Sequence, residues 1–189
     1  IRGFGSMLVL SLWLGEIDLK LANFGFVNNK GNKKIVHVDG DCSFASLQIY
    51  KAFEYGHSFN YEDINSLPLL KNYHPHNWLN SVREHSLISV RGKERESVDN
   101  ITKNSIFRSE VLKMVLYLSL LSDSIIDRFT EHYKVGCQDL FSLQSQLKQR
   151  RDIISRDLDK IKGFGDFILS DDAHKVKLEL VISLITFRM

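Results

Sequence analysis

Apolar residues recur at helical spacing through the second half of the chain, and this pattern restricts the fold more than any other feature. Between residues 137 and 162 they lie three, four and seven positions apart, as on one face of an α-helix. These residues are Leu140, Leu143, Leu147, Ile153, Ile154, Leu158 and Ile161. The windows 105–121, 123–134 and 171–187 predict further helices, and GFGDF at 163–167 predicts a break. The fold is therefore expected to be mainly α.

The first forty residues predict a small amount of β-structure. The run from Met7 to Leu14 is apolar enough for a buried helix or strand, and it stops at Gly15. After it, two apolar stretches, Phe24–Val27 and Ile35–Val38, flank the polar turn NNKGNKK, a pattern typical of a β-hairpin. The expected fold class is thus mainly α with a small β-hairpin near the N-terminus.

The stretch between the hairpin and the helical half is less regular. Apolar residues between Phe44 and Phe53 fit one face of a helix. Pro68 and Pro75 then interrupt the pattern, and the highly charged window 91–104 predicts an exposed loop. No linker divides the chain convincingly into two parts.

The composition fits one soluble domain over residues 1–189, with 43% apolar residues to fill a core. The net charge of +2, from 25 basic and 23 acidic residues, provides no field that would attract nucleic acid. Two cysteines, Cys42 and Cys137, match no metal-ligand spacing and favour a reduced, cytoplasmic setting. The run from Met7 to Leu14 is far shorter than the roughly 18 residues of a membrane span and follows no basic leader. We therefore expect neither a transmembrane segment nor a signal peptide.

The residues with the clearest chemical potential lie in segment 15–41, GEIDLKLANFGFVNNKGNKKIVHVDGD. Transfer of a phosphoryl group from a nucleotide needs a carboxylate at the acceptor, a cation at the moving phosphate and oxygen ligands for magnesium. Asp18 supplies the first and Lys20 the second, while Asn23 and Asp39 supply the ligands. A hairpin of the expected length would bring Asp39 back beside Asn23. We therefore predict Asp18 as the catalytic base, Lys20 as the ATP-phosphate contact, and Asn23 with Asp39 as the metal site.

These motifs resemble those of the protein kinase-like fold. D-L-K-L-A-N at 18–23 is similar to the catalytic loop D-x-K-x-x-N, and V-D-G-D at 38–41 stands where the magnesium-binding D-F-G stands. His37 gives a likeness to the H-I-D-F-G of phosphoinositide kinases, and D-G-D-x-x-F resembles divergent kinase-like effectors that intracellular bacteria inject into host cells. The resemblance implies ATP- and magnesium-dependent transfer to a protein or a phosphoinositide, and delivery of the protein into a host cell.

The resemblance covers the C-terminal lobe of such a fold. The 17 residues before Asp18 are too few for a Gly-rich phosphate loop, an ATP-pairing lysine and its glutamate partner, and GFG at 3–5 follows no strand. Glu16 also replaces the usual histidine, and glycine follows Asp39 directly. We therefore expect a kinase-like C-lobe whose N-lobe is absent, and weak or absent ATP binding. Such a chain is either a fragment inactive alone or a non-catalytic remnant or interaction module.

A second resemblance suggests different chemistry. D-G-D-C-S-F-A-S-L at 39–47 resembles the D-G-x-C-x-F-x-A nucleophile motif of ovarian-tumour-type deubiquitinases. It implies that Cys42 is a nucleophile activated at a helix N-terminus, with a base from His132 and Tyr133. The helical spacing around His132 and the hairpin before Asp39 argue against it, and D-L-K-L-A-N is left unexplained. A buried, unreactive Cys42 is the simpler interpretation.

Other polar patterns have structural explanations. His74, His76 and His85 lack a cysteine or acidic partner at ligand spacing and fit surface positions. A basic cluster that could contact lipid phosphates also fits a solvated loop; its members are Arg83, Arg91, Lys93 and Arg95. Because Asp and Asn are common in turns, the polar residues of segment 15–41 have a purely structural interpretation as well.

Overall fold

The computed structural model describes residues 2–15, 24–29, 31–37, 59–68, 100, 101, 103–131 and 140–186. Over these ranges the chain is mainly helical, with one small antiparallel sheet near the N-terminus, and the expected fold class is confirmed. In chain order the elements are α1 (Phe4–Leu14), β1 (Phe24–Asn29), β2 (Asn32–His37), α3 (Tyr61–Ser66), α6 (Ser105–Ser119), α7 (Asp123–Glu131), α8 (Leu140–Arg156), the 3-10 helix η3 (Leu158–Lys160), α9 (Phe164–Phe167) and α10 (Asp171–Thr186).

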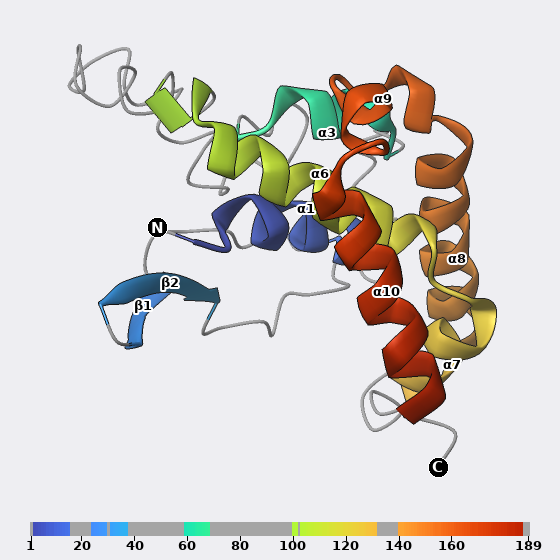
Figure 1. The fold of residues 1–189 in the computed structure, drawn as a ribbon. Helices are drawn as coiled ribbons and strands as arrows, with labels where there is room; N and C mark the ends of the chain where they lie inside the picture. Colours follow the sequence, from blue (N-terminus) through green and yellow to red (C-terminus); the bar gives the residue numbers. More distant parts are fainter. Residues whose placement is uncertain are drawn as a thin grey trace, which may run out of the picture.

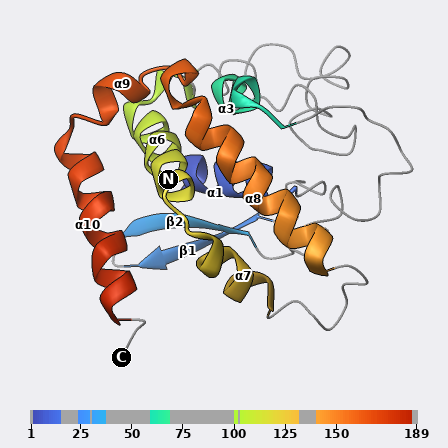
Figure 2. The ribbon, with the colours of Figure 1, turned by 90° about the vertical axis from the view of Figure 1, so that its right-hand side faces the viewer.

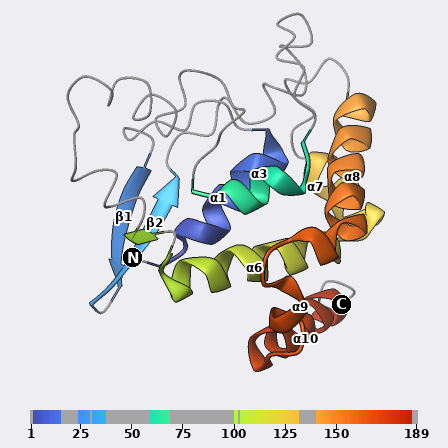
Figure 3. The same cartoon turned by 90° about the horizontal axis from the view of Figure 1, so that it is seen from above.

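Helix α1 lies in the middle of the helical body (Figure 1). Seen from above, α6 runs beside it, with the hairpin at one end and α8 at the other (Figure 3). Its sequence, FGSMLVLSLWL, is apolar almost all round, as expected of a helix buried on every side. Leu8, Val9, Leu12 and Trp13 are each at most 3% exposed. The apolar run that ends before Gly15 is therefore a buried helix.

The contact between α1 and α6 is closest at Gly5. A Cβ atom on Gly5 would lie 2.5 Å from the carbonyl oxygen of Phe107 and 3.0 Å from the amide nitrogen of Val111. Both are main-chain atoms, so only a residue without a side chain allows the two helices to approach this closely. The rings of Phe4 and Phe107 pack beside this contact, with centroids 5.8 Å apart and planes tilted by 45°.

The remaining long helices surround this pair. Helix α8 packs against α6 and α1, α7 packs on α8, and α10 crosses α6 on the outside (Figures 1 and 2). On α8, Leu143, Leu147 and Ile154 are almost completely buried, so the predicted apolar face is the one that meets the core. The N-terminal end of α10 is fixed to α6 by a 2.8 Å ion pair between Lys113 and Asp172. None of the helices in the described ranges is long and apolar enough to cross a membrane.

Helix α8 ends earlier than the apolar spacing predicts. The pattern indicates one helix over 137–162, whereas α8 ends at Arg156 and η3 follows. Asp157, buried at this junction, accepts hydrogen bonds from the Arg156 guanidinium (2.8 Å) and from Lys160 Nζ (2.9 Å). Ile161 still reaches the core, at 2% exposure. The apolar position was predicted correctly but the helix boundary was wrong, because the side-chain bonds of Asp157 hold a turn there.

Helix α3 is absent from the sequence prediction, although its start carries a recognisable signal. The side chain of Asn60 accepts a hydrogen bond from the Glu62 N–H (2.8 Å), and Asp63 Oδ2 accepts one from the Asn60 N–H (3.0 Å). This reciprocal pair is a capping box. Further along, the side chain of Asn65 bonds the main chain of Lys160 and Lys162, which ties α3 to the turn after α8.

The predicted hairpin is confirmed. Strands β1 and β2 are antiparallel, with Asn29 opposite Asn32 at the turn and Phe24 opposite His37 at the open end. Gly31 in the turn has φ of 82°, a left-handed conformation that suits glycine. The helix predicted between Phe44 and Phe53 and most of the window 91–104 lie outside the described residues.

Replacing Gly5 with alanine should destabilise the protein. The new methyl group would have to push the main chain of α6 away from α1, at a cost of about 1–3 kcal/mol. Urea unfolding followed by circular dichroism measures this as a lower midpoint. Gly165→Ala is the matched control: a Cβ there meets no atom within 4 Å, and alanine is favoured in a helix. Equal midpoints for the two variants would contradict the close contact.

Acid should destabilise the junction at Asp157. Hydrogen bonds from Arg156 and Lys160 hold the pKa of Asp157 well below its usual range in the folded state. In the unfolded chain an aspartate titrates near about 3.9, so Asp157 contributes its full stability above about pH 4. This contribution declines as pH falls further, towards the folded pKa. Urea midpoints between pH 2 and pH 6 should therefore fall less steeply for Asp157→Asn than for wild type. Asp159→Asn, at an exposed acid of the same turn, should follow the wild-type curve.

Candidate functional site

The four predicted site residues, Asp18, Lys20, Asn23 and Asp39, lie outside the described residues. The structure describes the elements that precede and separate them. Helix α1 ends four residues before Asp18, β1 begins directly after Asn23, and β2 ends two residues before Asp39. The geometry of these neighbouring elements therefore determines where the chain enters and leaves the candidate site.

A carboxylate from α6 caps the N-terminus of α1. The helix follows Gly3, which has no side chain to bind the free N–H groups of the first turn. Glu110 accepts hydrogen bonds from the N–H of Gly3 (2.7 Å) and of Gly5 (3.1 Å), one at each carboxylate oxygen. A negative charge at this end also interacts favourably with the helix dipole. Ser6 Oγ adds a bond to the main-chain oxygen of Glu110 (3.2 Å).

A cation from α8 caps the other end of α1. Arg150 Nη1 donates to the carbonyl oxygens of Leu12 (2.7 Å) and Trp13 (3.3 Å). Trp13 Nε1 in turn donates to the carbonyl oxygen of Leu147 on α8 (3.2 Å). The ring of Phe59 lies under the Arg150 guanidinium, 5.5 Å from centroid to Cζ. The last turn of α1, from which the chain continues towards Asp18, is thus fixed to α8 and to the segment before α3.

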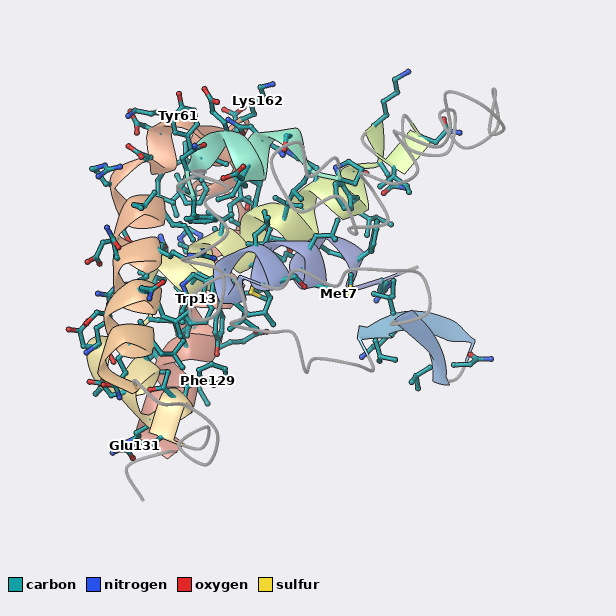
Figure 4. The ribbon with its side chains drawn as sticks, turned by 180° about the vertical axis from the view of Figure 1, so that it is seen from behind. Met7, Trp13, Tyr61, Phe129, Glu131 and Lys162 are labelled. Carbon is teal, nitrogen blue, oxygen red and sulfur yellow. The ribbon has the colours of Figure 1, made fainter. Side chains whose placement is uncertain are left out.

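Trp13 also connects this end of α1 to α7. Its ring lies 6.3 Å from the ring of Phe129, measured between centroids, and both are visible below α1 in Figure 4. The side chain is 3% exposed, so it fills the space between three helices while its only polar atom is bonded. The C-terminus of α1 therefore has apolar as well as polar contacts that hold it in place.

The charged groups between α7 and α8 form an ion-pair network. Arg151 contacts Asp123 at 2.7 Å, and Lys148 contacts Asp127 at 2.7 Å. The hydrogen bond from Arg151 lowers the pKa of Asp123, as the bond from Lys113 lowers the pKa of Asp172. A lowered pKa keeps a carboxylate charged at neutral pH. Each of these aspartates is therefore a charged partner of its cation in the folded protein.

No group of three histidine, cysteine or acidic side chains in the described part of the chain could hold a metal ion. The predicted ligands Asn23 and Asp39 lie outside the described residues, so the magnesium site stays a prediction. Cys42 and the pair His132–Tyr133 also lie outside the described residues, the pair directly after the end of α7. The deubiquitinase alternative likewise stays a prediction, as do the roles of the histidines and the basic cluster between residues 74 and 95.

Comparison with known proteins finds no family model, no curated protein and no solved structure that matches this chain. The residues and geometry of the chain itself are therefore the basis for proposing a function.

Arg150→Met should loosen the end of α1 that leads to the candidate site. Methionine keeps an aliphatic side chain but removes the donors to Leu12 and Trp13, whose loss should cost about 1.5–3 kcal/mol. Urea unfolding measures this cost. Gln149→Met, at the exposed neighbouring position on α8, should unfold like wild type. If both variants unfold alike, the guanidinium does not hold the helix end.

Proposed function

We propose that this chain is the catalytic lobe of a kinase-like phosphotransferase that depends on magnesium and ATP. In this proposal Asp18 deprotonates or orients the acceptor, Lys20 contacts the transferred phosphate, and Asn23 with Asp39 binds magnesium. One observation carries it. The two motifs that hold these residues are joined by a β-hairpin: one motif directly precedes its first strand, and the other directly follows its second.

The register of the hairpin supports a shared metal site. Phe24 is opposite His37 in the last pair of the ribbon, so the chain enters β1 and leaves β2 at the same end. Asn23 precedes this pair by one residue, and Asp39 follows it by two. An amide and a carboxylate attached so close to one end of a ribbon can both reach a single ion, which Mg²⁺ binds at about 2.0–2.1 Å from its oxygen ligands.

The same register weakens the purely structural interpretation of these residues. Asn and Asp often appear near hairpins because they form the turn. In this hairpin the turn lies between Asn29 and Asn32, at the opposite end from Asn23 and Asp39. Formation of the hairpin itself therefore does not explain the amide and the acid at the open end.

The anchoring of α1 supports the role of Asp18. Phosphoryl transfer depends on positioning, and positioned groups need rigid elements behind them. Three residues separate the end of α1 from Asp18, and Arg150 and Trp13 hold the last turn of that helix against α8. A short connection from a fixed helix end restricts the positions that the proposed base can take.

The proposal includes partners for the reaction. The acceptor is a protein or a phosphoinositide, and the setting is the cytoplasm, including that of a host cell into which the protein is delivered. Tight ATP binding in this proposal needs a β-rich nucleotide-binding half, because the sheet in the described part consists of two strands only. By itself the chain is expected to bind magnesium more readily than ATP.

Titration with Mn²⁺, a paramagnetic substitute for Mg²⁺, tests the metal site in the full chain. Electron paramagnetic resonance of free Mn²⁺ should detect binding by wild type, and Asp39→Asn and Asn23→Leu should each weaken it about tenfold or more. Asp171→Asn, at an exposed acid in the first turn of α10, is the control and should bind as wild type does. Circular dichroism checks that each variant keeps its helix content.

Two outcomes would contradict the proposal. Wild type that binds no Mn²⁺ lacks the predicted site, and binding that survives both substitutions lies elsewhere on the protein. Covalent reaction of Cys42 with a ubiquitin-based electrophile would support the deubiquitinase alternative in its place, and an unlabelled Cys42 would remove that alternative.

A further inference from the structure

One edge of strand β1 is not paired with any strand in the described part of the chain. The strand bonds β2 on its other side, and the ribbon lies beside the helical body with β2 as its link to α1 (Figures 1 and 2). An isolated pair of strands is only marginally stable in water, and a third strand adds much to its stability. The open side of β1 is therefore a place where a further strand would be favoured.

The register determines which main-chain groups of β1 point to this open side. Asn29 and Asn32 flank a two-residue turn, so they form a hydrogen-bonded pair. Bonded and non-bonded pairs then alternate along the ribbon. The residues of β1 whose N–H and C=O point away from β2 are Phe24, Phe26 and Asn28.

Strand β2 supports this assignment independently. Ile35 is opposite Phe26, so its main-chain groups should also point away from the ribbon. The N–H of Ile35 does so and donates to the carbonyl oxygen of Arg2 at 3.0 Å. The outer side of β2 is thus bonded at one position to the segment before α1.

The two strands also differ in charge. Exposed strand edges are normally protected against pairing by lysine, proline or a bulge. Strand β1, FGFVNN, has no charge and no proline, and its pairing with β2 is uninterrupted. Strand β2 carries Lys33 and Lys34. A copy of β1 could therefore approach β1 without repulsion between like charges, whereas two copies of β2 would bring their lysines together.

We propose that two copies of this chain associate through β1 to form a continuous four-stranded antiparallel sheet. With the two-fold axis at Phe26, this residue pairs with itself, and Phe24 pairs with Asn28 of the second copy. Each outward N–H of one strand then meets an outward C=O of the other. Each copy contributes its two strands to the sheet, one hairpin on either side of the axis. This proposal does not depend on the proposed phosphoryl transfer.

In this arrangement an exposed valine of each copy lies opposite a glycine of the other. Gly25 of one copy lies opposite Val27 of the other in a non-bonded pair, where Cα atoms are about 4.5 Å apart. Val27 is 50% exposed in the single chain, and Gly25 has no side chain to occupy the facing position. Association would therefore cover an exposed apolar side chain in each copy without a clash at this pair.

Substitution of Asn28 tests the proposal by sedimentation of the full chain over about a hundredfold range of concentration. Wild type should shift from monomer to dimer. Asn28→Pro removes an N–H that β2 does not use, so the hairpin should remain while dimerisation weakens about tenfold or more. Asn28→Thr keeps the N–H and should dimerise within about threefold of wild type.

A second variant should weaken dimerisation without removing any main-chain N–H or C=O group. Val27→Lys at the half-exposed position should keep the monomer folded, and it brings two lysines near each other across the axis. Hydrogen exchange at Phe24, Phe26 and Asn28 should slow with rising concentration in wild type and not in this variant. Wild type that stays monomeric overturns the proposal, and so does a dimer that Asn28→Pro and Val27→Lys leave unchanged.

Discussion

The fold depends on the burial of one uncharged helix. Helix α1 is apolar almost all round, so it is stable only when other elements cover every side of it. Helices α6 and α8 cover the face with Leu8 and Leu12, the face with Met7 and Leu10 is half-buried, and α6 approaches to the distance that Gly5 permits. Complete burial of a leucine such as Leu8 or Leu12 contributes about 1.5–3 kcal/mol. The open N–H and C=O groups at the two ends would offset part of this gain, and Glu110 and Arg150 bind them with charges that also suit the helix dipole.

These long-range contacts mark the limit of what the sequence alone could predict. Helices α6, α7 and α10 and the hairpin follow from patterns within each segment, and they were predicted nearly to their ends. The bonds of Glu110 and Arg150 to α1 join positions 107 and 138 residues apart, and nothing near either residue distinguishes it from an ordinary surface charge. The end of α8 was mispredicted because the bonds from Arg156 and Lys160 to Asp157 hold a turn at a point where the apolar spacing continues. Helix α3 is too short for a periodic pattern, although its capping box was present in the sequence.

The candidate site was predictable in its residue types and not in its geometry. An acid, a lysine, an amide and a second acid at these spacings suggest phosphoryl transfer, but spacing alone does not bring Asn23 and Asp39 together. In the proposal the hairpin supplies that link, because β1 begins and β2 ends at the same end of the ribbon, opposite the turn. The apolar stretches on either side of NNKGNKK thus contributed as much to the prediction as the polar residues did, because they specify the ribbon.

The two proposals for the hairpin use different parts of it and are compatible. The metal site requires the open end beyond Phe24 and His37, whereas association requires the side of β1. In an antiparallel pair centred on Phe26, the two Phe24 residues lie on opposite sides of the axis and four residues apart along the strands, or about 14 Å at the rise of a β-strand. The open ends therefore point away from each other. A dimer of this kind would stabilise the ribbon that connects Asn23 to Asp39 in the sequence, and its pairing would not involve the open ends of the two hairpins.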